Sequence, residues 1–249
     1  MNAVIRRFAD APALTRAALD LVAAAAREAI AQRGRFAMAL SGGATPLPLY
    51  AAMAREGYGA PPEATLFFFG DERLVPVSDS RSTFGVVAPL LFTPSPVPVG
   101  NIHPMPVEIR PAELAAATYE AEVRQALGTA PGEVPRFDLI LLGLGPDGHT
   151  ASLFPGSPAL AETAALVAAV PPPTTAAPAV PRLTFTLPLM NAARRVLFLT
   201  TAKGKEAALA KALADRPDPA VPASLVRPDG ELAWLVDEGQ GGVRRDQPK

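Results

Sequence analysis

The sequence contains no cysteine, and this absence excludes disulfides, thiol catalysis and cysteine-ligated metal sites. Histidine is almost absent as well, since His103 and His149 are the only two in 249 residues. Histidine is the side chain that most readily gains or loses a proton near neutral pH. Acid–base chemistry in that range is therefore expected to depend on one of these two side chains.

Charge is scarce and nearly balanced, with 19% charged residues and a formal net charge of −1. The chain has no basic footprint of the kind that binds nucleic acid, so no such partner is expected. Asp20 and Arg27 interrupt the apolar run at residues 19–27, which is too short to span a bilayer. With no recognisable signal peptide or membrane partner, we expect a cytoplasmic protein.

Hydrophobic residues are abundant, at 49%, and their pattern indicates the fold class. Several short runs are apolar along their whole length, which is typical of strands buried on both faces of a parallel sheet. The predicted strands are residues 36–40, 65–69, 138–142, 196–200 and 232–236. Helical patterns fall between them, at residues 11–33, 46–55, 112–127 and 205–214. This alternation predicts a doubly wound, Rossmann-like α/β fold, with a mostly parallel sheet and helices on both faces.

Some segments depart from this pattern. Residues 183–187 alternate polar and apolar side chains, so they are expected to form an edge strand or to lie at a subdomain boundary. The proline-rich stretches 89–106 and 171–181 are expected to be surface loops. We predict one α/β domain over residues 1–239 and a polar, disordered tail over residues 240–249.

The most informative segment is a glycine turn that follows the strand predicted at residues 138–142. It reads Gly-Leu-Gly-Pro-Asp-Gly from 143 to 148 and delivers His149 to what is predicted to be the start of a helix. The spacing matches G-x-G-x-x-G, a pattern of dinucleotide sites. Pro146 removes an amide from this turn, however, and no strand ending in an acidic residue follows about 20 residues later.

We therefore interpret the turn as a means of carrying His149 to the carboxyl edge of the sheet, where α/β proteins place their active sites. The alternative for His149 is a structural role, such as capping a helix. For His103, in the proline-rich loop, the structural interpretation is favoured.

A second glycine loop, at residues 41–46, follows the first predicted strand and opens a helix. Glycines let backbone amides approach an anion closely, hydroxyls add donors, and a helix N-terminus favours negative charge. The loop has no Walker-type lysine, and its alternative is an ordinary strand-to-helix turn. The residues predicted to bind phosphate are Ser41, Gly42, Gly43 and Thr45.

Charged residues follow two other strands. Asp71 and Arg73 come directly after residues 65–69, Arg81 lies a little further on, and Lys205 follows the strand at 196–200. Arginine suits bidentate phosphate or carboxylate binding, although solvated surface charges would have the same pattern. The ends of parallel strands share one edge of the sheet, so these groups point to an enzyme for a phosphorylated small molecule. No G-x-S-x-G elbow of a serine hydrolase occurs.

These segments resemble the glucosamine-6-phosphate isomerase/6-phosphogluconolactonase family. The matching stretches are residues 41–46, 71–76, 143–155 and 182–188, together with Lys203-Gly-Lys205. They occur in the family's order, and Gly-Pro-Asp-Gly-His-Thr-Ala-Ser-Leu-Phe-Pro is the most specific. The deaminase branch typically continues its turn with Ile-Gly/Ala-Phe-Asn-Glu-Pro, which this chain lacks.

The resemblance implies a fold similar to glucosamine-6-phosphate deaminase and ribose-5-phosphate isomerase. It implies hydrolysis of 6-phospho-D-glucono-1,5-lactone to 6-phospho-D-gluconate in the oxidative pentose phosphate pathway, without metal or organic cofactor. The expected assembly is a monomer or homodimer. A deaminase or isomerase acting on a sugar phosphate is the alternative activity, and a non-catalytic sugar-phosphate sensor is the alternative class.

The resemblance also implies roles for the site residues. His149 is expected to be the general base, Asp147 to orient it or to bind substrate hydroxyls, and Asp71 to face the sugar. Lys205 is expected to assist the phosphate loop. Arg73, Arg81 and Arg182 are expected to contact the phosphate or the oxyanion, with no division of roles among them.

Overall fold

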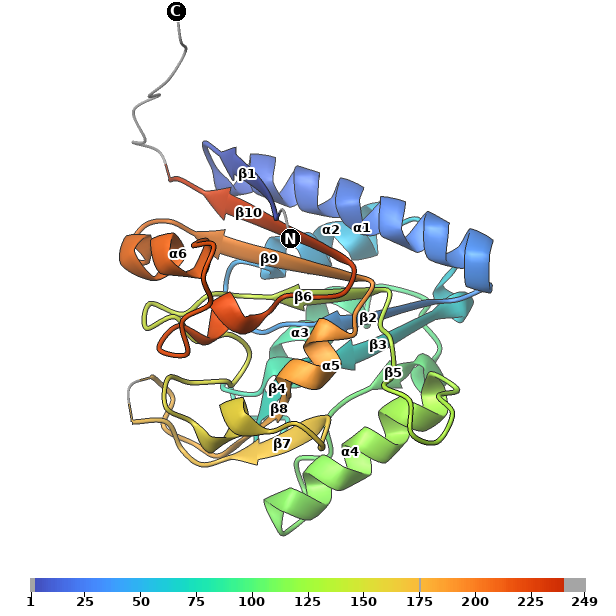
Figure 1. The fold of residues 1–249 in the computed structure, drawn as a ribbon. Coiled ribbons are helices and arrows are strands. Elements are labelled where there is room, and N and C mark those ends of the chain that lie inside the picture. Colours follow the sequence, from blue (N-terminus) through green and yellow to red (C-terminus); the bar gives the residue numbers. More distant parts are fainter. Residues whose placement is uncertain (1–2, 175, 240–249) are drawn as a thin grey trace, which may run out of the picture.

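The computed structural model describes residues 3–174 and 176–239, and the tail predicted at residues 240–249 lies outside them. A seven-stranded sheet in the order β1-β10-β9-β6-β2-β3-β5 forms its centre (Figure 1). Every neighbouring pair in this sheet is parallel. The strands are β1 (Val4–Phe8), β2 (Phe36–Leu40), β3 (Thr65–Phe69), β5 (Ile102–His103), β6 (Leu139–Leu142), β9 (Arg195–Thr201) and β10 (Glu231–Asp237).

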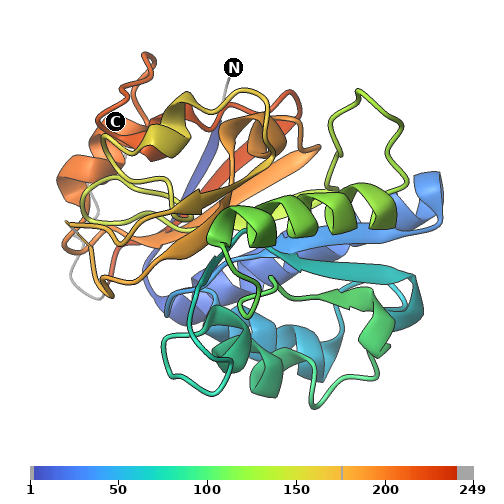
Figure 2. The same cartoon turned by 90° about the horizontal axis from the view of Figure 1, so that it is seen from below.

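Helices cover both faces of this sheet, with α1, α2 and α3 on one side and α4, α5 and α6 on the other (Figure 2). Their bounds are α1 (Ala11–Arg33), α2 (Leu47–Glu56), α3 (Thr83–Leu91), α4 (Ala112–Ala126), α5 (Leu187–Asn191) and α6 (Glu206–Ala212). The doubly wound α/β prediction is therefore confirmed. Within residues 3–174 and 176–239, no helix has the length and apolar character needed to cross a membrane.

Local signals explain why the predicted elements form. The Asp10 side chain accepts a hydrogen bond of 2.9 Å from the amide of Ala13 and caps α1, and Gly34 ends that helix with a φ of 71°. All residues of β2 and β6 are buried, as their continuous apolar character predicts. Predicted and observed bounds agree to within one or two residues for these elements.

A second, three-stranded antiparallel sheet was not predicted. It consists of β4 (Asp71–Arg73), β8 (Arg182–Phe185) and β7 (Val167–Val170), in the order β4-β8-β7. Of the two alternatives for residues 183–187, the edge strand is wrong, because β8 is the central strand of this sheet. In its register Asp71 lies opposite Thr184, and Arg73 lies opposite Arg182. The small sheet thus brings together charged residues that are more than a hundred positions apart.

Two further local predictions are wrong. The stretch 89–106 is not all loop, because α3 extends through Pro89 to Leu91 and β5 follows. The helix expected to start at His149 does not form. Ala151 adopts a left-handed φ of 47°, and a bridge joins Thr150 to Leu153. A left-handed residue stops helical propagation, so this segment folds as a compact turn.

The topology determines where a ligand can bind. From β2 the chain continues to β3 and β5 on one side, whereas β6, on the other side of β2, leads to β9 and β10. Connections leave β2 and β6 in opposite directions, and such a switch point opens a crevice at the carboxyl ends of the strands. The two glycine loops follow β2 and β6, so both lie at this crevice.

Candidate active site

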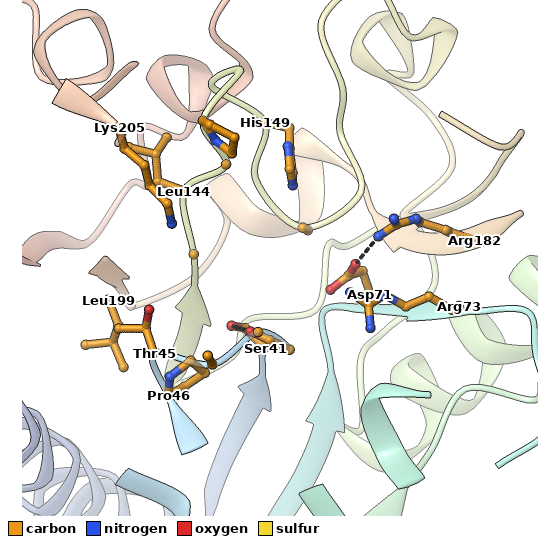
Figure 3. Close-up of a pocket in the computed structure, with 17 residues that line it drawn as sticks. Ser41, Thr45, Pro46, Asp71, Arg73, Leu144, His149, Arg182, Leu199 and Lys205 are labelled. Carbon is orange, nitrogen blue, oxygen red and sulfur yellow. Dashed lines mark hydrogen bonds and ion pairs between the residues drawn. The ribbon is translucent and has the colours of Figure 1, made fainter. Parts of the chain in front are cut away.

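A cleft of about 250 Å³ lies at this switch point (Figure 3). Its walls come from the segments that follow β2, β3, β6 and β9, together with Arg182 of β8. The predicted site residues that line it are Ser41, Gly42, Gly43, Thr45, Asp71, Arg73, His149, Arg182 and Lys205. Folding therefore gathers groups from five separate segments into one cavity.

The predicted phosphate loop is held by Tyr50, a residue of α2 with no distinguishing signal in the sequence. The Tyr50 hydroxyl donates to the carbonyl of Ser41 at 2.7 Å and accepts from its amide at 2.9 Å. Burial raises the pKa of Tyr50, so the phenol keeps its proton and remains a donor. Gly43 has a φ of 88°, a backbone conformation that glycine adopts without strain. The loop is thus a fixed turn with amides and hydroxyls at the cleft.

The His149 side chain enters the cleft with its Nδ1 held by Asp147. Oδ1 of Asp147 lies 2.5 Å from Nδ1 of His149 and also accepts from the His149 amide at 3.2 Å. Because Nδ1 donates to a carboxylate, Nε2 is the ring nitrogen with a lone pair for a ligand. The turn is closed by the Gly145 amide, which donates to the His149 carbonyl at 2.8 Å. Asp147 does not line the cleft and acts from behind the imidazole.

Arg182 is almost fully buried, with 3% of its surface exposed, yet it reaches the cleft. One terminal nitrogen, Nη1, lies 4.0 Å from Oδ2 of Asp71, and Nη2 donates to the carbonyl of Pro178 at 3.0 Å. The guanidinium also lies over the ring of Phe154, 5.2 Å from its centroid. Burial lowers the pKa of Arg182, although Asp71 acts in the opposite direction. The result is a fixed, poorly solvated cation whose Nε has no hydrogen-bond partner among the described residues.

The neighbouring carboxylate, Glu72, points away from the cleft, as alternation along β4 requires. It accepts backbone hydrogen bonds from Thr83 and Phe84, both at 2.7 Å, and one from Arg73 at 2.6 Å. Glu72 therefore caps the N-terminus of α3. Burial raises the pKa of this carboxyl. Asp71 and Glu72 are adjacent in sequence but have separate roles, one at the cleft and one structural.

The remaining basic residues differ in their position. Arg81 does not line the cleft, in contrast to the prediction, because its Nε and Nη2 pair with Asp79 at 2.9 and 2.6 Å. Its carbonyl accepts from Nη1 of Arg73 at 2.7 Å, so Arg81 supports Arg73 through its backbone. Lys205 immediately precedes α6 and lines the cleft, and burial lowers its pKa.

The second histidine lies outside the cleft. Nδ1 of His103 is 2.7 Å from a carboxylate oxygen of Glu122, and its ring stacks on Phe68 at 4.4 Å between centroids. These contacts are consistent with the structural interpretation of His103. In the described part of the chain, no group of three or more His, Asp or Glu side chains is placed to hold a metal ion.

A glycine turn at a helix N-terminus, buried and half-buried cations and an Asp–His pair meet at the switch point of a parallel sheet, and this arrangement is that of an α/β enzyme for phosphorylated small molecules. The model of one family, glucosamine-6-phosphate isomerases/6-phosphogluconolactonase, matches residues 9–234, and the chain belongs to this family.

Two curated relatives illustrate the similarity. A 6-phosphogluconolactonase of Synechocystis sp. is 44% identical over 90% of this chain and 91% of its own length. The 6-phosphogluconolactonase of Homo sapiens is 41% identical over 94% of this chain and 91% of its own. The crystal structure of 6-phosphogluconolactonase from Thermotoga maritima superimposes with a TM-score of 0.82 and 31% identity, covering 96% of this chain and all of that one.

Proposed function

We propose that the protein hydrolyses 6-phospho-D-glucono-1,5-lactone to 6-phospho-D-gluconate, the second step of the oxidative pentose phosphate pathway. The observation that carries the proposal is that His149, paired with Asp147 at 2.5 Å, lines the same cleft as the loop at residues 41–46. One end of the cleft suits a phosphate and the other has a base. The cytoplasm stays the predicted compartment.

The phosphate is assigned to the amides and hydroxyls of residues 41–45, at the N-terminus of α2, with Lys205 as its cationic partner. Figure 3 draws Thr45 and Lys205 on one side of the cleft and Asp71 and Arg182 on the other, with His149 between them. A phosphate at the first side directs the lactone ring toward His149 and Arg182.

His149 is assigned as the general base. Its Nε2 removes a proton from water while the water oxygen bonds to the lactone carbonyl carbon, and Asp147 stabilises the imidazolium that forms. The carbonyl oxygen gains negative charge, which we assign to Arg182 because its guanidinium is already fixed and desolvated. Collapse breaks the bond to the ring oxygen, and the imidazolium returns its proton to that oxygen, leaving a carboxylic acid that ionises.

The test compares His149→Ala with the unmodified protein on freshly made lactone, after subtraction of spontaneous hydrolysis. We expect kcat to fall by about 10²- to 10⁴-fold, the usual contribution of positioned acid–base catalysis. His103→Gln is the matched control, because it changes the other histidine, outside the cleft. Unchanged turnover in His149→Ala would contradict the assignment of the base.

Three controls address the substrate and the alternatives. Unphosphorylated gluconolactone should react poorly, and equal kcat/KM for both lactones would count against phosphate recognition. Ammonia release from glucosamine 6-phosphate would indicate a deaminase. Binding of 6-phosphogluconate without any turnover of the lactone would indicate a sensor instead of an enzyme.

A further inference from the structure

Ser152 has no assigned role in the proposed reaction, yet it makes a short hydrogen bond to Asp71, which lines the cleft. Its side chain is completely buried, and its Oγ donates to Oδ2 of Asp71 at 2.6 Å. Its amide donates to Oγ1 of Thr184 at 3.1 Å, which fixes the backbone from the other side. Ser152 thus joins the segment after β6 to the small sheet that carries Asp71.

The turn between His149 and Ser152 makes this contact possible. Ala151, which lines the cleft, has a φ of 47° and is the only non-glycine residue with positive φ within residues 3–174 and 176–239. Such a conformation is unfavourable for alanine and persists where the surrounding structure enforces it. It turns the chain so that His149 faces the cleft while Ser152 is buried beneath Asp71.

The hydrogen bond from Ser152 uses only one of the two oxygens of the Asp71 carboxylate. Oδ2 receives the Ser152 hydroxyl and lies 4.0 Å from Nη1 of Arg182. Oδ1 has no hydrogen-bond partner in the described part of the chain, and Asp71 lines the cleft. An ionised carboxylate only accepts hydrogen bonds, so its remaining oxygen suits a hydroxyl donor on a ligand.

Ser152 also keeps two opposite charges apart. At 4.0 Å, Arg182 and Asp71 attract each other without a close hydrogen bond. A carboxylate free to rotate would form the shorter, bidentate contact that arginine favours. That contact would turn the Asp71 carboxylate toward Arg182 and away from a hydroxyl of the ligand. The Ser152 hydroxyl opposes it by holding Oδ2 at 2.6 Å.

We propose that Ser152 is a positioning residue that holds Asp71 as the acceptor for the ring hydroxyl next to the reacting carbonyl. The protein then favours lactones that carry this hydroxyl over their 2-deoxy analogues. The inference rests on the proposed lactonase function. The hydroxyl is placed there because Arg182, assigned to the carbonyl oxygen, shares the carboxylate of Asp71, so the acceptor lies beside the carbonyl carbon.

The experiment measures kcat and KM for 6-phosphogluconolactone and for its 2-deoxy analogue. The proteins are the unmodified chain, Ser152→Ala, Asp71→Asn and the double variant. The unmodified protein should prefer the hydroxylated lactone by at least about 10-fold in kcat/KM, because loss of a hydrogen-bonding hydroxyl leaves a polar group of the site unpaired. Ser152→Ala should lose most of this preference and change little on the deoxy substrate. The double variant should be no worse than Asp71→Asn alone, because Ser152 acts through Asp71.

Ser157→Ala is the matched control, since Ser157 lies a few residues further on and bonds the amide of Ala159 instead of Asp71. Thermal unfolding checks each variant, and Ser152→Cys, which has a larger side chain and a weaker donor, is the second variant if alanine fails to fold. It should give an intermediate preference.

The outcomes separate this proposal from the proposed function. Equal losses on both lactones in Ser152→Ala would indicate a structural role and overturn the proposal. Additive losses in the double variant would overturn it as well, and so would an unmodified protein that does not discriminate between the lactones. Absence of any lactone turnover in the unmodified protein would remove the proposed function, and this proposal with it.

Discussion

A methyl group added at Gly145 would lie 2.1 Å from Nδ1 of His149 and 2.8 Å from Oδ1 of Asp147. The Asp–His pair therefore packs directly on the backbone of the glycine turn, and no side chain fits at this position. The glycines that match a dinucleotide pattern in the sequence have another purpose in the structure. Gly145 provides the space in which the carboxylate meets the imidazole, whereas a methyl group at Gly143 would meet nothing within 4 Å.

This contact gives the first prediction. Gly145→Ala should lower kcat by about 10²-fold or more, because the imidazole and the carboxylate must both move and positioned acid–base catalysis is lost. Gly100→Ala is the matched control, because the same methyl group there meets nothing within 4 Å. Steady-state kinetics with the lactone checks both variants. Equal activity of the two would show that the pair tolerates displacement.

Asp147→Asn tests the orientation of the imidazole. An amide in place of the carboxylate presents a donor to Nδ1 or binds it less strongly, which disfavours the tautomer with a free Nε2. We expect kcat to fall by about 10²- to 10⁴-fold with little change in KM, as for other Asp–His pairs that act on water or hydroxyls. A change confined to KM would instead place Asp147 in substrate binding.

The arginines should differ in their effect. Arg81→Ala removes a side chain that pairs with Asp79 outside the cleft, so kcat/KM should change by less than about 3-fold. Arg182→Ala removes the buried cation assigned to the oxyanion and should lower kcat by about 10²-fold or more. Lactone kinetics for the two variants, with thermal unfolding as a check, separates these expectations. A large loss of kcat/KM in Arg81→Ala would indicate that the Arg81 side chain contributes to the site.

Lys205 gives a prediction about pH. Burial lowers the pKa of Lys205, so its positive charge is present below that value and is lost at a lower pH than for an ordinary lysine. Affinity for 6-phosphogluconate should therefore weaken as pH rises through the lowered pKa, by at most about tenfold per pH unit. Calorimetric titrations with this stable product avoid spontaneous lactone opening. Lys205→Arg retains its charge and should lack this decline, and the same decline in both proteins would contradict the assignment.

Thr83, the first residue of α3, packs close to Gly42 in the loop at residues 41–46. A methyl group at Gly42 would lie 3.0 Å from Oγ1 of Thr83, a hydroxyl that is buried without a hydrogen-bond partner in the described part of the chain. Gly42→Ala should raise KM for the lactone by about 10-fold, because the loop must shift from its anion-binding geometry. Adding Thr83→Ala removes the obstructing atoms and should restore most of the affinity. Failure of the second change to restore affinity would indicate another cause.

Much of the fold was readable in the sequence, because short continuous apolar runs that alternate with helical patterns are typical of strands covered on both faces. The apolar runs of β2, β3, β6 and β9 were all predicted as strands. The segments that line the cleft begin where these strands end. The strand β1 was missed because its residues are mostly exposed and carry Arg6 and Arg7. Helix α3 was missed because Gly85 and Pro89 lie within it, and Glu72 and Ser82 stabilise its start.

The sequence by itself determined the parallel sheet, the two glycine loops and the presence of a histidine at the carboxyl edge. These are local properties: apolar runs, turn residues and their order along the chain. Tertiary structure alone decided which charges face the ligand. The small sheet pairs Arg73 with Arg182, places Asp71 in the cleft and turns Glu72 away, and Arg81 is left paired with Asp79 outside it. The pairing of β4 with β8 joins residues more than a hundred positions apart, which no local pattern encodes, whereas the Arg81–Asp79 pair spans only two positions.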